Sequence, residues 1–224
     1  MTIGVVDYGI GNLYSCFKAI EAAGGDVVMM DRPQELVGAD ALVVPGVGDF
    51  GACVRALRQG GFEEPLREML AKERPVLGIC VGMQMLFEGS DEAPGEDGLG
   101  ILAGRVRRLG PGVRLPQMQW NTLSYVPSPI ASESNDSSTS YPSLFRGLPE
   151  GLWVYFVHSY GVALGEFTTA SSCYGDTFSA AVQRGLLYGT QFHPEKSSSV
   201  GLSILRNFVE IVREMNVKRE VERA

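Results

Sequence analysis

The chain of 224 residues is 45% hydrophobic and 20% charged, with a formal net charge of −7 at pH 7. These values describe a globular protein of one domain or two small ones. The acidic balance excludes a general nucleic-acid-binding surface, and no apolar run reaches the ~18 residues of a membrane span. We therefore expect neither a nucleic-acid nor a membrane partner.

The first half of the chain alternates between predicted strands and helices. Strands are predicted at residues 2–7, 26–30, 41–44 and 75–79, and helices at residues 12–23, 50–59, 63–72 and from Val81 to Phe87. This alternation is typical of a parallel sheet with right-handed helical crossovers. The N-terminal run lacks a basic start, which favours a first strand over a signal peptide.

The second half is richer in β-type runs. They lie near Val106 and Leu123 and at residues 153–157, 168–174, 178–182 and 186–192, before a predicted helix at 203–215. Residues 127–143 hold seven serines and three prolines, which predicts a surface loop inserted in the domain. We predict an α/β fold, with a mostly parallel central sheet flanked by helices and an added antiparallel β region. A single domain would span residues 1–217, and a charged tail at 218–224 would fray.

The four cysteines are predicted to be free thiols. Cys16, Cys53, Cys80 and Cys173 form no Cys-x-x-Cys pair, and they share no zinc-ligand spacing with a histidine. We therefore expect no metal, no cofactor and a reducing, cytoplasmic location.

One cysteine lies in a motif that carries chemistry. Gly78-Ile79-Cys80-Val81-Gly82 has the spacing of a nucleophile elbow with cysteine in the nucleophile position. In such an elbow a strand turns sharply into a helix, and the first N–H groups of that helix favour a thiolate. The N–H of Val81 would face a developing oxyanion. The alternative is a buried cysteine that only packs at the end of a strand.

A thiol nucleophile needs a base, and the chain has only two histidines. His193 follows a predicted strand, and Glu195 can orient its ring, which is the nucleophile–base–orienter logic of a triad. His158 is the rival base, but it lies in the aromatic run at residues 153–160, where a histidine is more often structural. We therefore favour Cys80, His193 and Glu195 as the catalytic residues.

Pro45-Gly46-Val47-Gly48 also follows a predicted strand. In a parallel sheet this loop and the elbow lie at the same carboxyl edge, where the N–H of Val47 could be a second oxyanion donor. Because glycines flank Val47, we predict that the Gly46–Val47 peptide can flip between two orientations. Losing one oxyanion donor costs ~3 kcal/mol, so the chain alone should be nearly inactive. The alternative is an ordinary glycine-rich turn.

Several of these segments carry a family resemblance. GICVGMQMLFE, the PGVG loop and QFHPEKS resemble the class I glutamine amidotransferases, which have a flavodoxin-like fold. More narrowly, YGIGN, PGVGDFG, FVHSY and HPEKSS are similar to the glutaminase subunits of imidazole glycerol phosphate synthase in histidine biosynthesis. The resemblance covers nearly the whole chain apart from the serine-rich insertion and the tail.

The resemblance implies a mechanism. Cys80 would attack the side-chain amide of glutamine, release ammonia and leave a glutamyl thioester, which water hydrolyses to glutamate. His193 would shuttle the proton and Glu195 would hold the ring, while the N–H groups of Val47 and Val81 would bind the oxyanion. The implied glutamine-binding set is Gln84, Glu92 and the main chain at Ser159 and Tyr160.

The resemblance further implies a heterodimer with a (β/α)₈-barrel cyclase subunit. That subunit would use the ammonia to make imidazole glycerol phosphate and an aminoimidazole carboxamide ribonucleotide. The implied partner contacts are Asn12, Gln117, Trp120 and Lys196, with core packing as the alternative for Trp120. Residues 116–121 read PQMQWN where the family usually has PHMGWN, so Gln117 and Gln119 depart from the pattern.

Two other functions stay open at this point. The same chemistry could serve another acceptor, as in the glutaminase of pyridoxal phosphate synthesis, although YGIGN and HPEKS argue against it. A non-catalytic subunit that regulates a partner is the third hypothesis, and the intact set of Cys80, His193 and Glu195 argues against that one.

Overall fold

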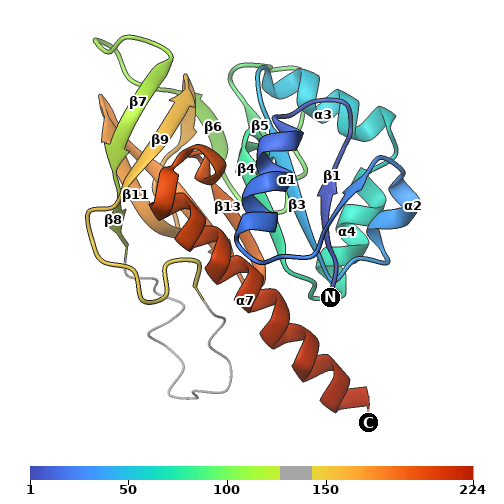
Figure 1. Cartoon of the computed structure of the whole chain (residues 1–224). Coiled ribbons are helices and arrows are strands. Elements are labelled where there is room, and N and C mark those ends of the chain that lie inside the picture. Colours follow the sequence, from blue (N-terminus) through green and yellow to red (C-terminus); the bar gives the residue numbers. More distant parts are fainter. Residues whose placement is uncertain (127–142, 224) are drawn as a thin grey trace.

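The computed structural model describes residues 1–126 and 143–223, so the predicted insertion lies outside the described residues except for Ser143. Its centre is an eight-stranded sheet with the order β2-β1-β3-β4-β13-β12-β11-β8 (Figure 1). The parallel strands are β2 (Val27–Met30), β1 (Ile3–Val6), β3 (Ala41–Gly46), β4 (Val76–Cys80) and β13 (Leu187–Thr190). The antiparallel strands are β12 (Asp176–Arg184), β11 (Thr168–Tyr174) and β8 (Ser124–Tyr125). The predicted fold class is confirmed.

Helices cover both faces of the parallel part. The helices are α1 (Leu13–Ala22), α2 (Pro33–Leu36), α3 (Phe50–Gln59), α4 (Glu63–Ala71), α5 (Val81–Gln84) and α7 (Ser198–Arg223), with a 3₁₀ turn η1 (Pro194–Lys196) before α7. Helices α1 and α7 contact each other in front of the sheet, and α4 lies behind it (Figure 1). The short α5 follows β4 with no residue between them, so the chain turns from strand to helix at Cys80.

Two small sheets complete the fold. One has the order β10-β6-β5, from β5 (Gly89–Ser90), β6 (Arg105–Arg108) and β10 (Tyr160–Val162). The other is the antiparallel pair β7 (Gln117–Thr122) and β9 (Trp153–His158). Because only Ser159 separates β9 from β10, the chain passes from one small sheet into the other beside the elbow.

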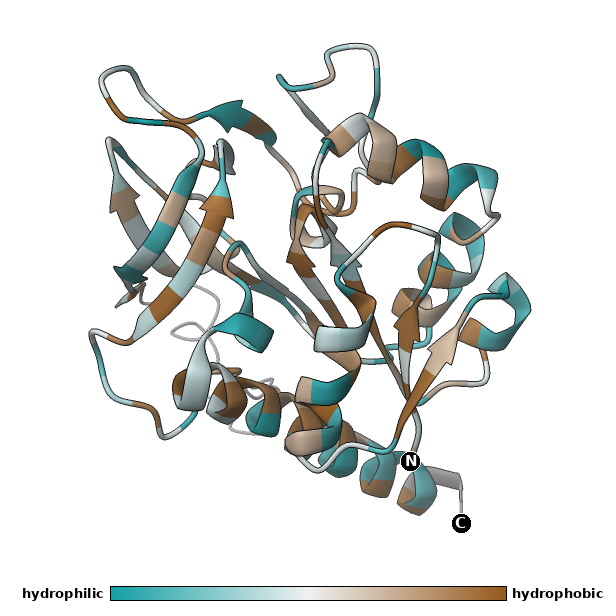
Figure 2. Ribbon diagram, turned by 45° about the horizontal axis from the view of Figure 1, so that its top comes forward, coloured by the Kyte–Doolittle hydropathy of each residue, from teal (hydrophilic) through white to brown (hydrophobic). Residues whose placement is uncertain are grey.

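The core follows from the composition of the parallel strands. Every residue of β1, β3, β4 and β13 is buried, as expected for strands covered on both faces. Figure 2 shows these strands largely in the hydrophobic colours, whereas the helices alternate between hydrophobic and hydrophilic positions. Within the described residues, no helix combines the length and the apolar character needed to cross a membrane.

The C-terminal helix differs from the prediction. A helix at 203–215 with a fraying tail from Lys218 was expected, but α7 begins at Ser198 and continues to Arg223. Long-range contacts extend it, because Arg219 lies 3.8 Å from the Asp40 carboxylate and the Asn216 side chain also hydrogen-bonds Asp40. The sequence around the tail contains no sign of this distant anchor.

The boundaries of three elements near the site also differ from the prediction. α5 is a single turn and ends at Gln84, not at Phe87, and β3 continues through Pro45 to Gly46, where a loop was expected. The polar run of β7 was not predicted as a strand, because its sequence QMQWNT lacks clear alternation, and pairing with β9 is what extends it. The extension of β3 is the difference that affects the site most, because it places Gly46 opposite Cys80 in the sheet.

Candidate active site

Cys80 lies at the sharp turn between β4 and α5. Its backbone has φ 55° and ψ −112°, a conformation that non-glycine residues rarely adopt. The turn needs glycine on both sides: a Cβ on Gly82 would lie 1.9 Å from the Val44 carbonyl oxygen, and one on Gly78 would lie 2.7 Å from the Gly82 carbonyl oxygen. The strained cysteine is therefore held by close backbone packing, as the elbow motif predicts.

His193 is held just after β13 by its neighbours. Its Nδ1 lies 2.8 Å from Glu195 Oε1, its N–H donates to the Tyr155 carbonyl at 3.0 Å, and its carbonyl accepts from Ser197 Oγ at 2.6 Å. The Nε2 atom is buried and has no hydrogen-bond partner among the described residues. One ring nitrogen is thus fixed by a carboxylate, and the other is left for proton transfer.

The electrostatics of His193 favour a cation. Burial lowers the pKa of this imidazole, but its interactions with the neighbouring Cys80 and Glu195 outweigh burial and raise the pKa to about 10. A cationic ring beside the sulfur stabilises negative charge there and carries a proton for a leaving group. The arrangement can therefore perform nucleophilic catalysis with an acid–base histidine.

His158, the rival base, is placed differently. Its Nδ1 lies 2.8 Å from the Tyr160 carbonyl oxygen, which can only accept, so this nitrogen carries the proton. Burial lowers the pKa of His158 to about 4, and the ring packs edge-on against Phe178 at 4.9 Å between centroids. A neutral, hydrogen-bonded imidazole among aromatic rings fits the structural interpretation of this residue.

A pocket of about 310 Å³ opens at Cys80. Its wall gathers residues predicted from distant parts of the sequence: Val47, Cys80, Val81, Gln84, Glu92, Ser159, Tyr160, His193 and Lys196. Pro116, Val157 and His158 also line it. Glu195 contacts the ring of His193 and does not itself line the pocket. The described residues contain no cluster of three or more His, Cys, Asp or Glu that could hold a metal ion.

One buried residue in this network was not predicted. Gln191 is fully buried, and its Oε1 accepts from Gln84 Nε2 at 3.0 Å while its Nε2 donates to Cys80 Sγ at 3.7 Å. Gln84 Nε2 also donates to the Tyr160 carbonyl at 2.9 Å. A signal existed in the sequence, because Gln191 precedes His193 by two residues and extended chain places such residues on the same side.

The comparisons with known proteins agree with this geometry. The family description "Glutamine amidotransferase class-I" matches residues 4–212. The chain belongs to the class I glutamine amidotransferase family. It is 45% identical over 215 residues to the "Imidazole glycerol phosphate synthase subunit HisH" of Synechococcus sp. (strain JA-3-3Ab), with 94% of each chain covered. It is 44% identical over 208 residues to the subunit of the same name from Deinococcus radiodurans, with 91% of each covered. Within the amidotransferases, the chain is thus a member of the HisH family.

Solved structures support the fold of this amidotransferase. "Crystal structure of glutamine amidotransferase" superposes with a TM-score of 0.70 at 21% identity, covering 94% of this chain and 98% of that one. The structure of PurLQS from Thermotoga maritima superposes with a TM-score of 0.67 at 17% identity, covering 93% of this chain and 97% of that one. At these identities the likeness concerns the fold alone.

The predicted glutamine-binding residue Glu92 has a defined partner in this amidotransferase. Its Oε2 accepts from the N–H of Phe50, the first residue of α3, at 3.0 Å. Burial raises the pKa of this carboxyl group, and the Phe50 N–H opposes that rise. The carboxylate lies on the pocket wall, where it can pair with an ammonium group.

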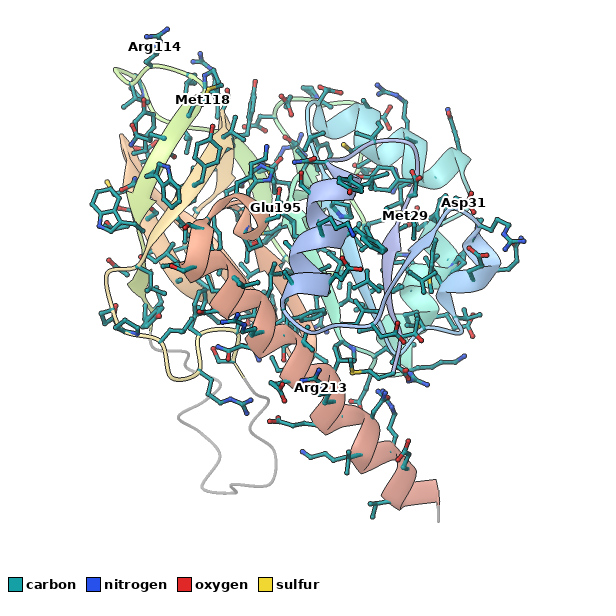
Figure 3. All side chains as sticks on the ribbon, viewed as in Figure 1. Met29, Asp31, Arg114, Met118, Glu195 and Arg213 are labelled. Carbon is teal, nitrogen blue, oxygen red and sulfur yellow. The ribbon has the colours of Figure 1, made fainter. Side chains whose placement is uncertain are left out.

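The expected partner contacts of the amidotransferase divide into exposed and buried residues. Trp120 on β7 is 43% exposed, and Met118 and Trp153 of the same small sheet are also exposed, so core packing of Trp120 is wrong. Figure 3 shows Met118 at the upper end of β7. Asn12 is half-buried just before α1, and Lys196 lies in the pocket wall.

Gln117 does not fit its expected place among the partner contacts. It has no exposed surface, and neither polar atom of its amide has a hydrogen-bond partner in the described part of the chain. In the β7–β9 pair it lies directly opposite His158, on the covered side of the small sheet. A buried side chain offers no surface to another chain, so the departure from the family pattern at this position concerns the interior.

Proposed function

We propose that this chain is the glutaminase subunit of an imidazole glycerol phosphate synthase. One observation carries the proposal. The strained Cys80 and His193 line the same pocket, and Nδ1 of His193 hydrogen-bonds the buried carboxylate of Glu195. The HisH relatives, which match nearly their whole length, support the assignment to this synthase.

The first half of the reaction forms a thioester. The Cys80 thiolate attacks the side-chain carbonyl carbon of glutamine, and the N–H of Val81 binds the oxyanion that develops. His193 gives its proton to the amide nitrogen, the C–N bond breaks, and ammonia leaves. A glutamyl thioester on Cys80 and a neutral His193 remain. Glu195 keeps the ring oriented while its charge changes.

The second half returns the enzyme to its starting state. His193 takes a proton from water as the water oxygen attacks the thioester carbonyl. The C–S bond then breaks, the thiolate leaves, and glutamate is released. His193 is again cationic beside the thiolate, so no net proton is stored between turnovers.

Substrate binding is assigned to the other pocket residues. The Glu92 carboxylate would pair with the α-ammonium of glutamine, while Gln84 and the main chain at Ser159 and Tyr160 would hold the rest of the head group. Both N–H groups of the Gln84 amide have partners within the protein, so Gln84 would offer its oxygen. The charge of Glu92 favours an amino acid over an uncharged amide.

The partner is a second subunit of the synthase. We assign it the (β/α)₈-barrel cyclase, which would receive ammonia at the pocket face and form a heterodimer with this chain in the cytoplasm. Asn12, Trp120 and Lys196 are the proposed contacts, and exposed aromatic residues such as Trp120 are frequent anchors of interfaces. Partner binding would turn the Val47 N–H toward the oxyanion and switch the reaction on.

The experiment measures glutamate release from glutamine by the purified chain, alone and with the cyclase subunit of a related synthase plus its ribonucleotide ligand. We expect the cyclase subunit to raise the rate of glutamate release on the order of a hundredfold or more, which is the effect of one oxyanion donor. Glutamate release should be lost in Cys80→Ala. Activation by a pyridoxal phosphate synthase instead would contradict the assignment of acceptor. A folded complex without any turnover would contradict the glutaminase itself.

A further inference from the structure

The loop that carries Glu92 is closed at its neck and is strongly acidic. Residues 89–98 read GSDEAPGEDG, with four carboxylates and no basic side chain. Near the two ends of the loop, Gly89 and Asp97 form an antiparallel bridge. Because like charges this close along the chain repel one another, the loop depends on cations from outside it to keep one conformation.

Arg105 on β6 holds the side of the loop that leads into Glu92. Its Nε donates to the Asp91 carboxylate at 2.7 Å, and its Nη2 donates to the Ser90 carbonyl at 3.0 Å. The Ser90 hydroxyl oxygen in turn accepts from the N–H of Glu92 at 3.1 Å. One guanidinium therefore bonds the two residues directly before Glu92, in a forked geometry that lysine does not reproduce.

Arg58 on α3 holds the other side of the loop. Its Nη1 donates to the Asp97 carbonyl at 2.8 Å, and its Nη2 donates to the Gly98 carbonyl at 3.0 Å. Its Nε is held by the Glu63 carboxylate at 2.7 Å, which orients the guanidinium plane. The loop is thus held by one arginine near each of its ends, from two different elements.

The Glu92 carboxylate is bonded to the same helix as the loop. Its Oε2 accepts from the N–H of Phe50, the first residue of α3, at 3.0 Å. A carboxylate oxygen can accept more than one hydrogen bond, so this bond orients the group toward the pocket without using up its capacity. Neither Arg58 nor Arg105 lines the pocket, whereas Glu92 does.

We propose that Arg58 and Arg105 are positioning residues that hold the loop at residues 89–98 so that Glu92 meets the α-ammonium group of glutamine. This proposal rests on the proposed function, in which Glu92 binds that group. When either guanidinium is removed, repulsion among the carboxylates and the lost hydrogen bonds let the loop adopt other conformations. Fewer molecules then present Glu92 correctly, so the loss falls on recognition of the ammonium group and not on the chemical step.

The test measures glutamate release by the chain together with the cyclase subunit of a related synthase. Glutaramate, which has the side-chain amide of glutamine but no α-ammonium group, is added as a competitive inhibitor. Arg58→Gln and Arg105→Gln should each raise KM for glutamine by about three- to tenfold, as expected for charge-assisted hydrogen bonds of half-exposed groups. The kcat and the inhibition constant of glutaramate should stay within about twofold of wild type.

Two further variants separate this role from a general effect of charge or folding. Arg107→Gln removes the same charge from an exposed position two residues farther along β6 and should leave KM unchanged. Glu92→Gln should raise KM at least as much as Arg105→Gln, and the double variant should be little worse than Glu92→Gln alone, because the arginine acts through Glu92. Arg105→Lys keeps the charge and should give a smaller rise than Arg105→Gln.

Thermal unfolding of each variant verifies that it is folded. Unchanged KM in Arg58→Gln and Arg105→Gln would overturn the proposal, as would an equal rise in Arg107→Gln, a matching rise in the inhibition constant of glutaramate, or full additivity with Glu92→Gln. If the wild-type complex releases no glutamate, the proposed function fails. If that complex is active and Glu92→Gln alone raises KM, only the positioning role of the arginines fails.

Discussion

Nδ1 of His193 and Oε1 of Glu195 lie 2.8 Å apart, in a pair whose side chains are only 2% and 3% exposed. The second oxygen of Glu195 has no hydrogen-bond partner among the described residues, so the carboxylate acts mainly on the ring. Figure 3 shows Glu195 between helix α1 and the start of α7. Water is excluded from this pair, which strengthens its electrostatic interaction.

Removing the charge of Glu195 should impair turnover more than substrate binding. Glu195→Gln keeps the shape of the side chain, but an amide does not stabilise the imidazolium and can fix the wrong tautomer. We expect kcat of the activated complex to fall by about 10²–10⁴-fold with little change in KM. Steady-state glutamate release measures this, and a loss confined to KM would contradict the role of Glu195 as the orienter of His193.

The raised pKa of His193 predicts a dependence of stability on pH. Cys80 and Glu195 outweigh burial and hold the folded pKa at about 10, whereas an unfolded histidine titrates near ~6.5. Because the folded value is the higher one, the stabilisation is complete below pH ~6.5 and is lost as the pH rises toward about 10. Urea unfolding across this range should show a steeper decline for wild type than for His193→Asn; parallel declines would contradict the prediction.

Gln191 links the substrate pocket to the nucleophile. In Gln191→Leu, the Gln84 amide loses one partner and Cys80 loses a donor within a buried region, which costs ~1–3 kcal/mol for the unsatisfied group. We expect kcat/KM to fall by about 10- to 100-fold. Gln59→Leu, at the exposed end of α3, is the matched control. Equal kinetics of the two variants would show that Gln191 only fills space.

The elbow should not accept a side chain at Gly82. The Cβ of Gly82→Ala would lie 1.9 Å from the Val44 carbonyl oxygen, so β3 and α5 must separate. We expect the free energy of unfolding to fall by ~3 kcal/mol or more. Gly95→Ala is the control, because open space surrounds that position and its effect should stay within about 0.5 kcal/mol. Chemical denaturation measures the free energy of unfolding of both variants, and an equal loss in the two would contradict the prediction.

The exposed Trp120 should contribute strongly to partner binding. Trp120→Ala removes a large aromatic side chain that leans edge-on against Tyr155, and central aromatic residues of interfaces often contribute ~2 kcal/mol or more. We expect Kd for the cyclase subunit to rise about 30-fold or more. Val28→Ala, on edge strand β2, should leave Kd unchanged. Calorimetric titration that gives wild-type affinity for Trp120→Ala would remove this residue from the interface.

The proposed catalytic residues could largely be predicted from local sequence. A cysteine between glycines at a strand end has few ways to turn into a helix, and the steric contacts of Gly78 and Gly82 explain why. His193 and Glu195 are two residues apart, so a short turn is enough to bring them together. Apolar runs likewise predicted the parallel strands, since strands covered on both faces need continuous hydrophobic residues.

Contacts between segments that are distant in the chain could not be predicted from the sequence. Asp40 anchors the end of α7 through Asn216 and Arg219, and burial of Gln117 depends on how β7 pairs with β9. No local sequence pattern predicts the contacts of Asp40 or the burial of Gln117. The same is true of Tyr8 and Cys53, which are 45 positions apart in the chain and both hydrogen-bond the loop at residues 45–48.

The amino-acid sequence by itself therefore determined the α/β class, the elbow at Cys80 and the choice of His193 and Glu195, because each rests on backbone sterics or on neighbours within a few residues. Only the tertiary structure decided that Gln191 joins Gln84 to Cys80 and that Tyr8 and Cys53 fasten the loop around Val47. A hydrogen bond forms only where packing brings its donor and acceptor to about 3 Å. That distance depends on the whole fold rather than on spacing along the chain.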